Sequence, residues 1–362
     1  MAVAANKGIY KVELWYKGQQ RIGNIRRMTQ NLRWVKKLNG VYSIDFSLDT
    51  QKFLEYCKSI GENPRNVLWP LLTDVRIKVR DTYVIGAHVV GIPPNFNKNN
   101  ATIQVSCDGF LILPGRRHIT KNYASMFTGN IIKDALDVKQ SVPNGDMGIV
   151  FDPTSYLGQS GTRQDTYVDQ NIQELIVNRS SYITDPFDFE FAPDRKLKLY
   201  QRIGNLRPDT VVTYPGVKRT IKASSMSMKH TGTDVANQII ALGSGFGLEA
   251  LRYVADDFAS QLKYGIIEDI VVFNNVTNID TLADHAHTEL EKRKETLILP
   301  TATVSGMQYK TDERGIGDTI IMSQDKYSLY SMDGLHRVNE MSVSVGANDD
   351  EDIKLTVDNY GI

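Results

Sequence analysis

The chain has 362 residues, of which 41% are hydrophobic and 23% are charged, and this length predicts two or more folded modules at the usual ~100–200 residues each. Its 42 Lys and Arg residues balance 42 Asp and Glu residues, so the formal net charge is zero. A dedicated nucleic-acid binder needs an excess of basic residues to displace counterions, so the balance argues against that class, although local patches remain able to touch DNA in passing. A neutral chain suits a protein that associates with others.

The cysteines and the first residues indicate folding in a cytoplasm. Cys57 and Cys107 lie far apart in the sequence. A single disulfide between them is the alternative interpretation. Two buried free thiols are favoured, because a disulfide-stapled secreted scaffold carries many more cysteines. Residues 1–7 lack the apolar core of a signal peptide. No run approaches the ~20 apolar residues that span a bilayer, so we expect no membrane-spanning segment.

Residues 1–120 show mainly strand patterns. Val41–Leu48 alternates apolar and polar side chains, as a half-buried strand does. Gln51–Ile60 is the one helical stretch, with Phe53, Leu54, Cys57 and Ile60 along one face. Other strands are expected at Ile9–Tyr16, Asp74–Val79, Thr82–Gly91 and Thr102–Cys107. Many short strands and one helix predict a small antiparallel barrel or sandwich for residues 1–120.

Residues 121–200 have a mixed pattern that predicts an α+β domain. Helical spacing is found in Ser125–Val138 and in Asp169–Arg179, for which Asp169 is the expected N-cap. The polar, Gly-rich segment Gly145–Gly161 between them is either disordered or a contact surface. A hairpin is expected from the last two strand-like runs, Phe187–Phe191 and Lys196–Tyr200.

The remaining residues predict a second β-barrel that holds an insertion. Strand patterns fill Val217–Lys229 and Asp234–Leu242, and the cluster Gly243–Gly247 then breaks the chain. Residues 248–295 contain an irregular stretch, the strand Gly265–Phe273 and the helix Asp280–Lys294. Strands resume from Val304. We therefore assign residues 201–247 and 296–362 to the second barrel and residues 248–295 to an inserted strand-helix domain. Two strand-rich blocks suggest duplicated structure, although the residues show no repeat.

The glycine cluster does not fit a phosphate-binding loop. Gly243-x-Gly245-x-Gly247 lacks the G-x-G-x-x-G spacing and the βαβ context of a dinucleotide site. A tight turn or a close approach of two backbone segments explains these glycines better.

Two other clusters resemble metal ligands but have the wrong spacing. His285 and His287 point about 200° apart around a helix, so they cannot share a metal as an i, i+4 pair does, and we expect solvated or interface histidines. The acidic run Asp349–Asp352 lacks the glycine and the distal glutamate of a calcium loop. A solvated turn between the last two strands is the expectation.

No catalytic constellation is present in the sequence. G-x-S-x-G, H-E-x-x-H and Cys/His arrangements are missing, and acids such as Glu268 and Asp269 are too common to indicate chemistry. We therefore predict no catalytic, cofactor-binding or metal-binding residue, no cofactor, and a protein that is not an enzyme. Basic clusters fall either in solvated loops or on a surface that meets an acidic partner or DNA: Arg26-Arg27, Lys36-Lys37 and Arg116-Arg117-His118.

The order of these elements resembles the tail hub, or distal baseplate hub, proteins of tailed bacteriophages and of contractile injection systems. The resemblance covers nearly the whole chain, and the order carries it more than any single motif. It rests on Ile9–Tyr16 with Val41–Leu48, Phe187–Tyr200, Gly243–Gly247 with Tyr264-Gly265 and the strand to Phe273, Leu282–Lys294, Ile316–Thr319, Arg337-Val338, Met341–Val345 and Ile353–Val357.

This resemblance implies a fold and a role. The fold is mainly β with α+β insertions, with two similar tail-tube-like barrels in each chain. Three copies would form a ring of six barrels around a central channel, which joins the six-fold tail tube to a three-fold spike or fibre and lets DNA pass during ejection. The implied partners are further copies in a homotrimer, a tail tube or distal tail protein, a tape-measure protein and a spike or fibre protein. The implied location is the virion tail tip, with assembly in the host cytoplasm.

Two alternative functions are also compatible with the sequence. A receptor- or carbohydrate-binding β protein of the tail tip would use exposed aromatic residues in loops, for which Tyr156, Tyr167 and Tyr182 are candidates. A cell-wall hydrolase would need paired carboxylates, and only scattered ones are present.

Overall fold

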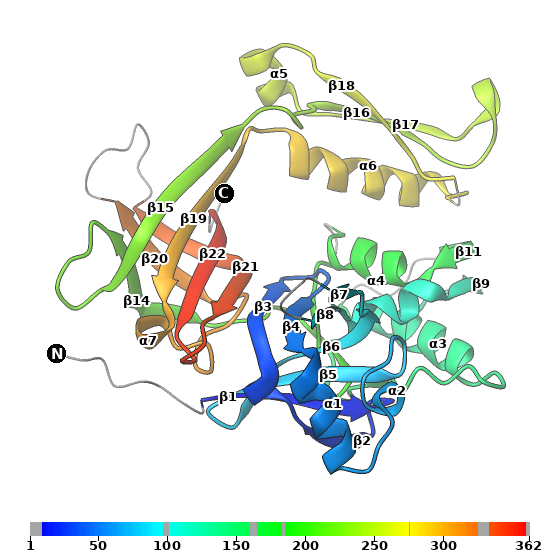
Figure 1. The fold of residues 1–362 in the computed structure, drawn as a ribbon. Coiled ribbons are helices and arrows are strands. Elements are labelled where there is room, and N and C mark those ends of the chain that lie inside the picture. Colours follow the sequence, from blue (N-terminus) through cyan, green and yellow to red (C-terminus); the bar gives the residue numbers. More distant parts are fainter. Residues whose placement is uncertain are drawn as a thin grey trace.

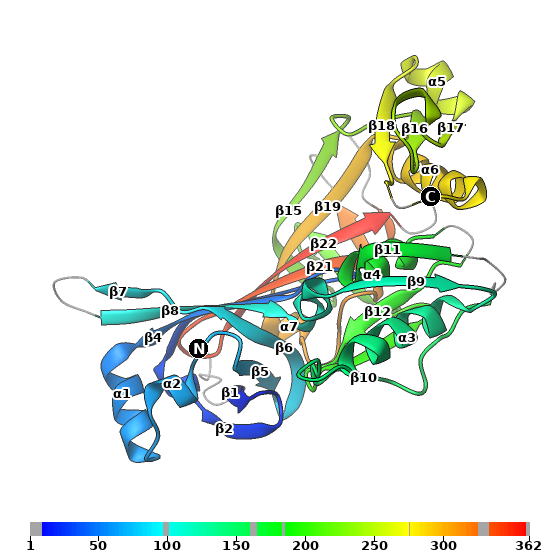
Figure 2. The same ribbon diagram turned by 90° about the vertical axis from the view of Figure 1, so that its right-hand side faces the viewer.

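A computed structural model describes residues 9–96, 101–159, 165–182, 185–274, 276–324 and 333–359. Most of the regular structure is strand, arranged in one sheet of 14 strands and three small sheets. Figures 1 and 2 show two strand-rich blocks side by side, with one mixed module against the first block and a second carried above them on two long strands. The expectation of a mainly β fold with α+β insertions is confirmed.

The N-terminal block is a seven-stranded run of the large sheet, in the order β2-β1-β5-β6-β8-β4-β3. Asp49 begins α1 by accepting a hydrogen bond from the backbone N–H of Lys52. Of the predicted helix face, Phe53 and Cys57 are buried, but Leu54 and Ile60 are exposed, which corrects the expectation. The elements are β1 (Tyr10–Tyr16), β2 (Gln20–Asn24), β3 (Thr29–Lys37), β4 (Ser43–Asp49), α1 (Thr50–Ser59), α2 (Pro64–Val67), β5 (Thr73–Val79), β6 (Thr82–Gly91), β7 (Pro94–Phe96) and β8 (Ala101–Gly109).

The C-terminal block is a closed barrel. Its strands follow the order β21-β20-β14-β15-β19-β22, and β22 pairs back to β21. The barrel elements are β14 (Leu206–Tyr214), β15 (Ile221–Thr231), β19 (Leu297–Ser305), α7 (Gly306–Tyr309), β20 (Thr319–Gln324), β21 (Gly334–Val345) and β22 (Glu351–Asn359). Closure removes the unpaired edges that an open sheet leaves.

The two blocks form one continuous sheet and one core. β3 pairs antiparallel with β21 from Leu32–Val345 to Lys37–Glu340. Buried side chains from both blocks, such as Trp34 and Val343, belong to the same hydrophobic cluster. At the other end of the sheet, β2 pairs with β1 alone among the described residues. The first block is therefore an open sheet that continues into the barrel. It is not a second barrel closed by its own strand pairing.

The first mixed module contains β9 (His118–Tyr123), α3 (Thr128–Gln140), β10 (Val150–Phe151), β11 (Asp165–Asn171), α4 (Ile172–Ser180), β12 (Asp188–Phe191) and β13 (Lys196–Tyr200). The predicted hairpin is the antiparallel pair β12–β13. Asn171, rather than Asp169, caps α4, because its side chain accepts from the N–H groups of Gln173 and Glu174. Within the Gly-rich segment, β10 pairs parallel with β13, and a role for this segment as a contact surface remains a prediction. Residues 160 and 161 lie outside the described residues.

The second mixed module is inserted between β15 and β19. It contains β16 (Gln238–Leu242), β17 (Arg252–Asp256), α5 (Phe258–Tyr264), β18 (Glu268–Val272) and α6 (Ile279–Arg293). The sheet order is β17-β16-β18, and α6 packs on one face through Leu282, Ala286 and Leu290. We expected the insertion to begin after residue 247. Because β16 pairs with β17 and β18, the insertion already includes β16. The stretch expected to be irregular holds β17 and α5.

Candidate functional site

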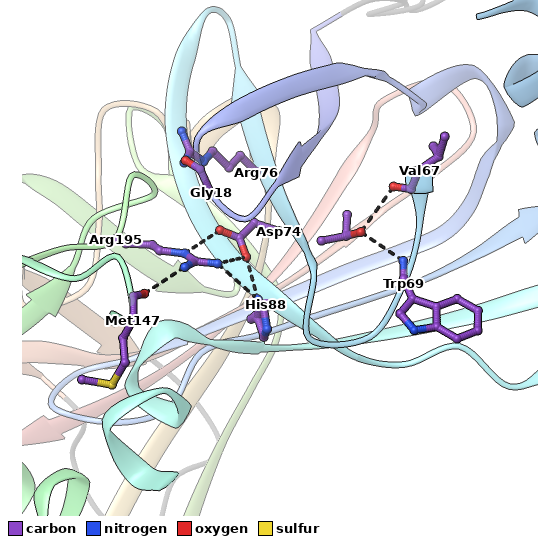
Figure 3. A network of polar contacts seen from close by, with 9 residues as sticks. Gly18, Val67, Trp69, Asp74, Arg76, His88, Met147 and Arg195 are labelled. Carbon is purple, nitrogen blue, oxygen red and sulfur yellow. Dashed lines mark hydrogen bonds and ion pairs between the residues drawn. The ribbon is translucent and has the colours of Figure 1, made fainter. Parts of the chain in front are cut away.

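A buried ion-pair network joins the N-terminal sheet to the first mixed module (Figure 3). Arg195, in the turn between β12 and β13, binds Asp74 of β5 through two hydrogen bonds of 2.7 Å, from Nε to Oδ2 and from Nη2 to Oδ1. Its Nη1 donates to the Met147 carbonyl at 2.9 Å. The Nδ1 of His88 lies 2.7 Å from the Asp74 carboxylate. All three charged or titratable side chains are buried, so the pairing compensates the desolvation that each one suffers.

Two glycines allow this close contact. A Cβ on Gly18, whose φ is +71°, would lie 2.7 Å from Nε of Arg195. A Cβ on Gly86 of β6 would lie 2.7 Å from the Cα of Pro193. The hairpin turn can therefore rest directly on the sheet because neither position carries a side chain.

Asp188 is a second buried junction and connects three parts of the chain. Its Oδ1 accepts a hydrogen bond of 2.9 Å from Asn39, which follows β3. Its Oδ2 accepts from the Ile203 N–H at 2.6 Å and pairs with Arg337 of β21. Beside it, Lys36 of β3 pairs with Glu190 of β12 at 2.6 Å. These contacts fix β12 to both strand-rich blocks.

The acidic run Asp349–Asp352, at the turn into β22, forms a third junction. Asp349, with a positive φ of 61°, pairs with Arg26 at 2.7 Å and accepts from the N–H of Tyr10 at 3.3 Å. The hydroxyl groups of Tyr10 and Thr311 both contact Glu351. Burial raises the pKa of the Glu351 carboxyl. The expectation of a solvated turn is therefore wrong for Asp349 and Glu351, which are both buried.

A cleft of about 570 Å³ separates the two mixed modules. α4 contributes Glu174, Asn178 and Arg179 to its wall, and α6 contributes Thr281 and His285. Arg179 is buried and donates to Tyr167 at 2.8 Å, to Thr128 at 3.2 Å, and to Asp165. The cleft is polar, but its buried cation is engaged within the protein.

His285 of α6 lines this cleft. Its Nε2 lies 3.0 Å from the hydroxyl oxygen of Tyr182, and its ring stacks on Phe273 at 4.5 Å between centroids. Burial, together with the charge of Arg179, lowers the pKa of His285 to about 4. His287 points elsewhere and contacts the hydroxyl of Tyr253 at 3.1 Å. The two histidines therefore do not share a site, as their spacing predicted.

The tyrosines proposed as glycan platforms are committed to internal contacts. The Tyr156 hydroxyl donates to Asp185 at 2.7 Å. Tyr167 accepts from Arg179, and burial raises the pKa of its hydroxyl to about 12. Tyr182 is buried.

Most of the basic clusters have partners within the chain. Arg26 and Lys36 form the ion pairs described above, and Arg117 donates to the Gly145 carbonyl at 3.3 Å. Arg27, Lys37 and Arg116 are exposed. Arg26 and Lys36 are therefore engaged within the molecule, and contact of the exposed basic residues with an acidic partner or DNA remains a prediction.

The two cysteines are free and buried, as expected. Burial raises the pKa of the Cys57 thiol to about 11 and also raises that of Cys107. At the glycine cluster, Gly245 has a φ of +114°, and its backbone passes close to Ala250. This supports a turn with close backbone approach rather than a phosphate loop.

Within the described ranges, no group of three or more potential ligands is arranged to hold a metal ion. None of the helices described is long and apolar enough to cross a membrane. The buried junctions at Asp74, Asp188 and Asp349 pair acids with bases and hydrogen-bond donors, and they do not present a nucleophile beside a general base. What this arrangement provides is rigid attachment between modules.

Sequence reasoning did not find these junctions. Asp74 and Arg195 are 121 positions apart, and Arg26 and Asp349 are 323 positions apart. Acids inside predicted strands, such as Asp74 in β5, were the only available signal, because an ionised side chain in a buried strand needs a partner.

No protein-family model matches the sequence, and no curated protein matches it. Solved structures do match the fold. A tail protein from Neisseria meningitidis MC58 is 13% identical, with a TM-score of 0.62, over 98% of this chain and 97% of that one. The 43 kDa tail protein of prophage MuSo2 from Shewanella oneidensis is 10% identical, with a TM-score of 0.62, over 96% and 98% of the two chains.

A third similar structure comes from a secretion system. An Escherichia coli component of the type VI secretion system, described as structurally similar to the T4 bacteriophage tail proteins gp27 and gp5, is 10% identical with a TM-score of 0.52, over 92% of this chain and 74% of that one. This chain therefore has the fold of these phage tail proteins and of the secretion-system component. The likeness covers nearly the whole chain, as the sequence resemblance indicated.

Proposed function

We propose that this protein is a structural component of a phage tail, namely the hub at the tail tip. In this role three copies form a ring with a central channel, and the ring joins a six-fold tail tube to a three-fold spike or fibre and lets DNA pass during ejection. The observation that carries the proposal is the match to tail proteins over nearly the whole length of both chains.

The internal architecture supports the proposal. One chain carries two strand-rich blocks joined edge to edge through β3 and β21. Three such chains would place six strand-rich blocks around an axis, and these six blocks would match a six-fold tail tube on one side of the ring. The ring itself has three-fold symmetry, which would match a three-fold spike or fibre on the other side. The two mixed modules would lie as separate domains attached to this ring.

Shape and rigid attachment are sufficient for this role, so no catalytic residue is required. The proposed partners are two further copies of the chain, the tail tube or a distal tail protein, the tape-measure protein, and a spike or fibre protein. The proposed location is the virion tail tip, after assembly in the host cytoplasm. Receptor or glycan binding is less well supported, because Tyr156, Tyr167 and Tyr182 are used internally.

The test combines microscopy with reconstitution. Electron microscopy of the purified chain should show three-fold rings with an open axial channel. Co-sedimentation should show binding to the tail tube and spike proteins of the same particle. A chain that stays monomeric at high concentration and binds neither protein would contradict the proposal, and binding on a glycan array by the isolated chain would favour the receptor-binding alternative.

A further inference from the structure

The second mixed module is joined to the barrel by a narrow ribbon of two strands. Residues 228–231 of β15 pair with residues 297–300 of β19. The pairing of β15 with β14 is confined to Ile221 and Lys222, and the pairing of β19 with β22 begins at Thr301. Within the described residues, the ribbon therefore has no third strand beside it (Figure 1). Two-stranded ribbons are weakly stabilised and strongly twisted, so this connection is able to bend.

The second module rests against the first without sharing a hydrophobic core with it. The buried apolar side chains of the two modules form separate clusters, one that includes Leu175 and Phe189 and another that includes Leu282 and Ala286. The cleft of about 570 Å³ lies between α4 of the first module and α6 of the second. Two domains move relative to each other unless a large apolar interface holds them, and here the two cores stop on either side of a polar cleft.

His285 and Tyr182 make a contact across this cleft, which we call the latch. Nε2 of His285 lies 3.0 Å from the hydroxyl oxygen of Tyr182, and the two rings meet edge to face with their centroids 5.0 Å apart. Phe273, in the same module as His285, stacks on the imidazole ring. One hydrogen bond and one ring contact contribute modestly to the free energy of a contact, so the charge of a single side chain is able to decide whether the latch holds.

A proton on His285 would add positive charge beside another cation. The guanidinium of Arg179 lies 5.3 Å from the centre of the Tyr182 ring that His285 contacts. The acids around His285 already have partners: Asp165 with Arg179, Glu289 with Lys292, and Glu174 with Gln170. Burial and the charge of Arg179 therefore lower the pKa of His285 to about 4 while the modules touch. When the second module swings away, water reaches the ring and its ordinary pKa of about 6.5 returns, so protonation favours separation.

We propose that the second mixed module is a hinged arm, that the latch holds it against the first module, and that protonation of His285 releases it. The two-stranded ribbon supplies the hinge. The separate cores allow the modules to part without exposing buried apolar side chains. Opening exposes the polar walls of the cleft on α4 and α6. The device lies within one chain, so it does not depend on the number of copies in the proposed ring.

The test measures the distance between the two modules of one chain. Spin labels are attached at Val150→Cys in the first module and at Leu262→Cys in the second, where the native side chains are 55% and 91% exposed. Cys57 and Cys107 are buried and do not compete for the label. Mixing with an excess of unlabelled chain confines the measurement to a single copy. Double electron–electron resonance should show one distance at pH 7 and a second, longer distance at pH 5, with the opening equilibrium constant raised up to about twentyfold.

Variants at His285 separate the effect of its charge from the loss of its side chain. His285→Lys is charged at both pH values and should show the longer distance already at pH 7. His285→Gln is neutral and keeps a hydrogen-bonding group near Tyr182, so it should stay closed at pH 5. His287→Gln, on the same helix, is the matched control and should respond to pH as the unchanged chain does. Circular dichroism at each pH checks that every variant is folded.

Two outcomes would overturn the proposal. The first is a single, unchanged distance at both pH values in the chain with His285. The second is a longer distance at pH 5 that persists in His285→Gln, because another group then controls the arm. If His285→Lys does not fold, the comparison of the unchanged His285 with His285→Gln decides the matter. Neither outcome bears on the hub proposal, which the count of copies in the unlabelled chain tests separately.

Discussion

The two mixed modules of this chain differ in how completely they bury their apolar surface. The first encloses an aromatic core, including Phe187, Phe189 and Phe191, between two helices and two small sheets. The second has a single helix on one side of its sheet, and the other side carries exposed Ile270 and Val272. The first module therefore buries its apolar side chains within itself, whereas the second leaves apolar side chains exposed on one face of its sheet.

The modules differ equally in how they are attached. Buried ion pairs fix the first to the strand-rich blocks, with Asp74–Arg195 and Asp188–Arg337 as the most enclosed. The second is carried on β15 and β19 (Figure 1), and its α6 meets the first module at His285, whose Nε2 lies 3.0 Å from the hydroxyl oxygen of Tyr182. Buried ion pairs therefore fix the first module, whereas the second extends on two long strands.

The largest expected effect comes from removing the anchor of the first module. Arg195→Ala leaves the Asp74 carboxylate buried beside His88 without its cation. Breaking a buried pair in this way costs about 3–5 kcal/mol in the free energy of unfolding. Urea denaturation should show the loss. Lys196→Ala, at the neighbouring position with an ion pair of 3.8 Å to Asp194, should change the free energy by less than about 0.5 kcal/mol. Similar losses for both variants would contradict the role of the network.

The next largest effect on stability compares a buried side chain of the inserted module with an exposed one. Leu282→Ala on the buried side of α6 removes a fully buried side chain and should cost about 2–5 kcal/mol in the stability of the module. Leu262→Ala on α5 removes an exposed side chain and should cost less than about 0.5 kcal/mol in the monomer. Hydrogen exchange of the β16 amides reports both. A large loss for Leu262→Ala in the monomer would mean that α5 is part of the core of the module.

The smallest effect is the pH dependence at the contact between the modules. The pKa of His285 is about 4 in the folded protein and about 6.5 when the side chain is free, so between these values the unfolded chain binds more protons. The free energy of unfolding therefore falls as the pH drops from 6.5 to 4, by at most about 3 kcal/mol. Above pH 6.5 the contribution is constant.

Exchange rates of the α6 amides at pH 7 and pH 4.5 check this expectation. His285→Gln should remove the pH-dependent part, because glutamine does not titrate in this range. His287→Gln, on the same helix, should retain it. A pH response that persists in His285→Gln would assign the effect to another group.

The sequence was sufficient for features that depend on local patterns. β6 was expected from a strand-like run and α6 from helical spacing, and their observed limits agree with the expected ones to within a residue at each end. β12 and β13 were recognised from the turn residues between two apolar runs. These signals work because neighbouring residues determine the period and the turn.

Features that depend on distant partners were not predictable. Asp349 was expected in solvent, because nothing near it indicates that Arg26 lies beside it. The glycines at 243–247 were taken as the end of a barrel, although β16 before them pairs with β17 and β18. The short segments β17 and α5 were missed because their exposed apolar residues break the amphipathic pattern.

The number of copies in the assembled protein tests the central claim most directly. Native mass spectrometry of the unchanged chain, over a range of concentrations, should show a species of three times 40.7 kDa. A single-copy species at every concentration would contradict the account.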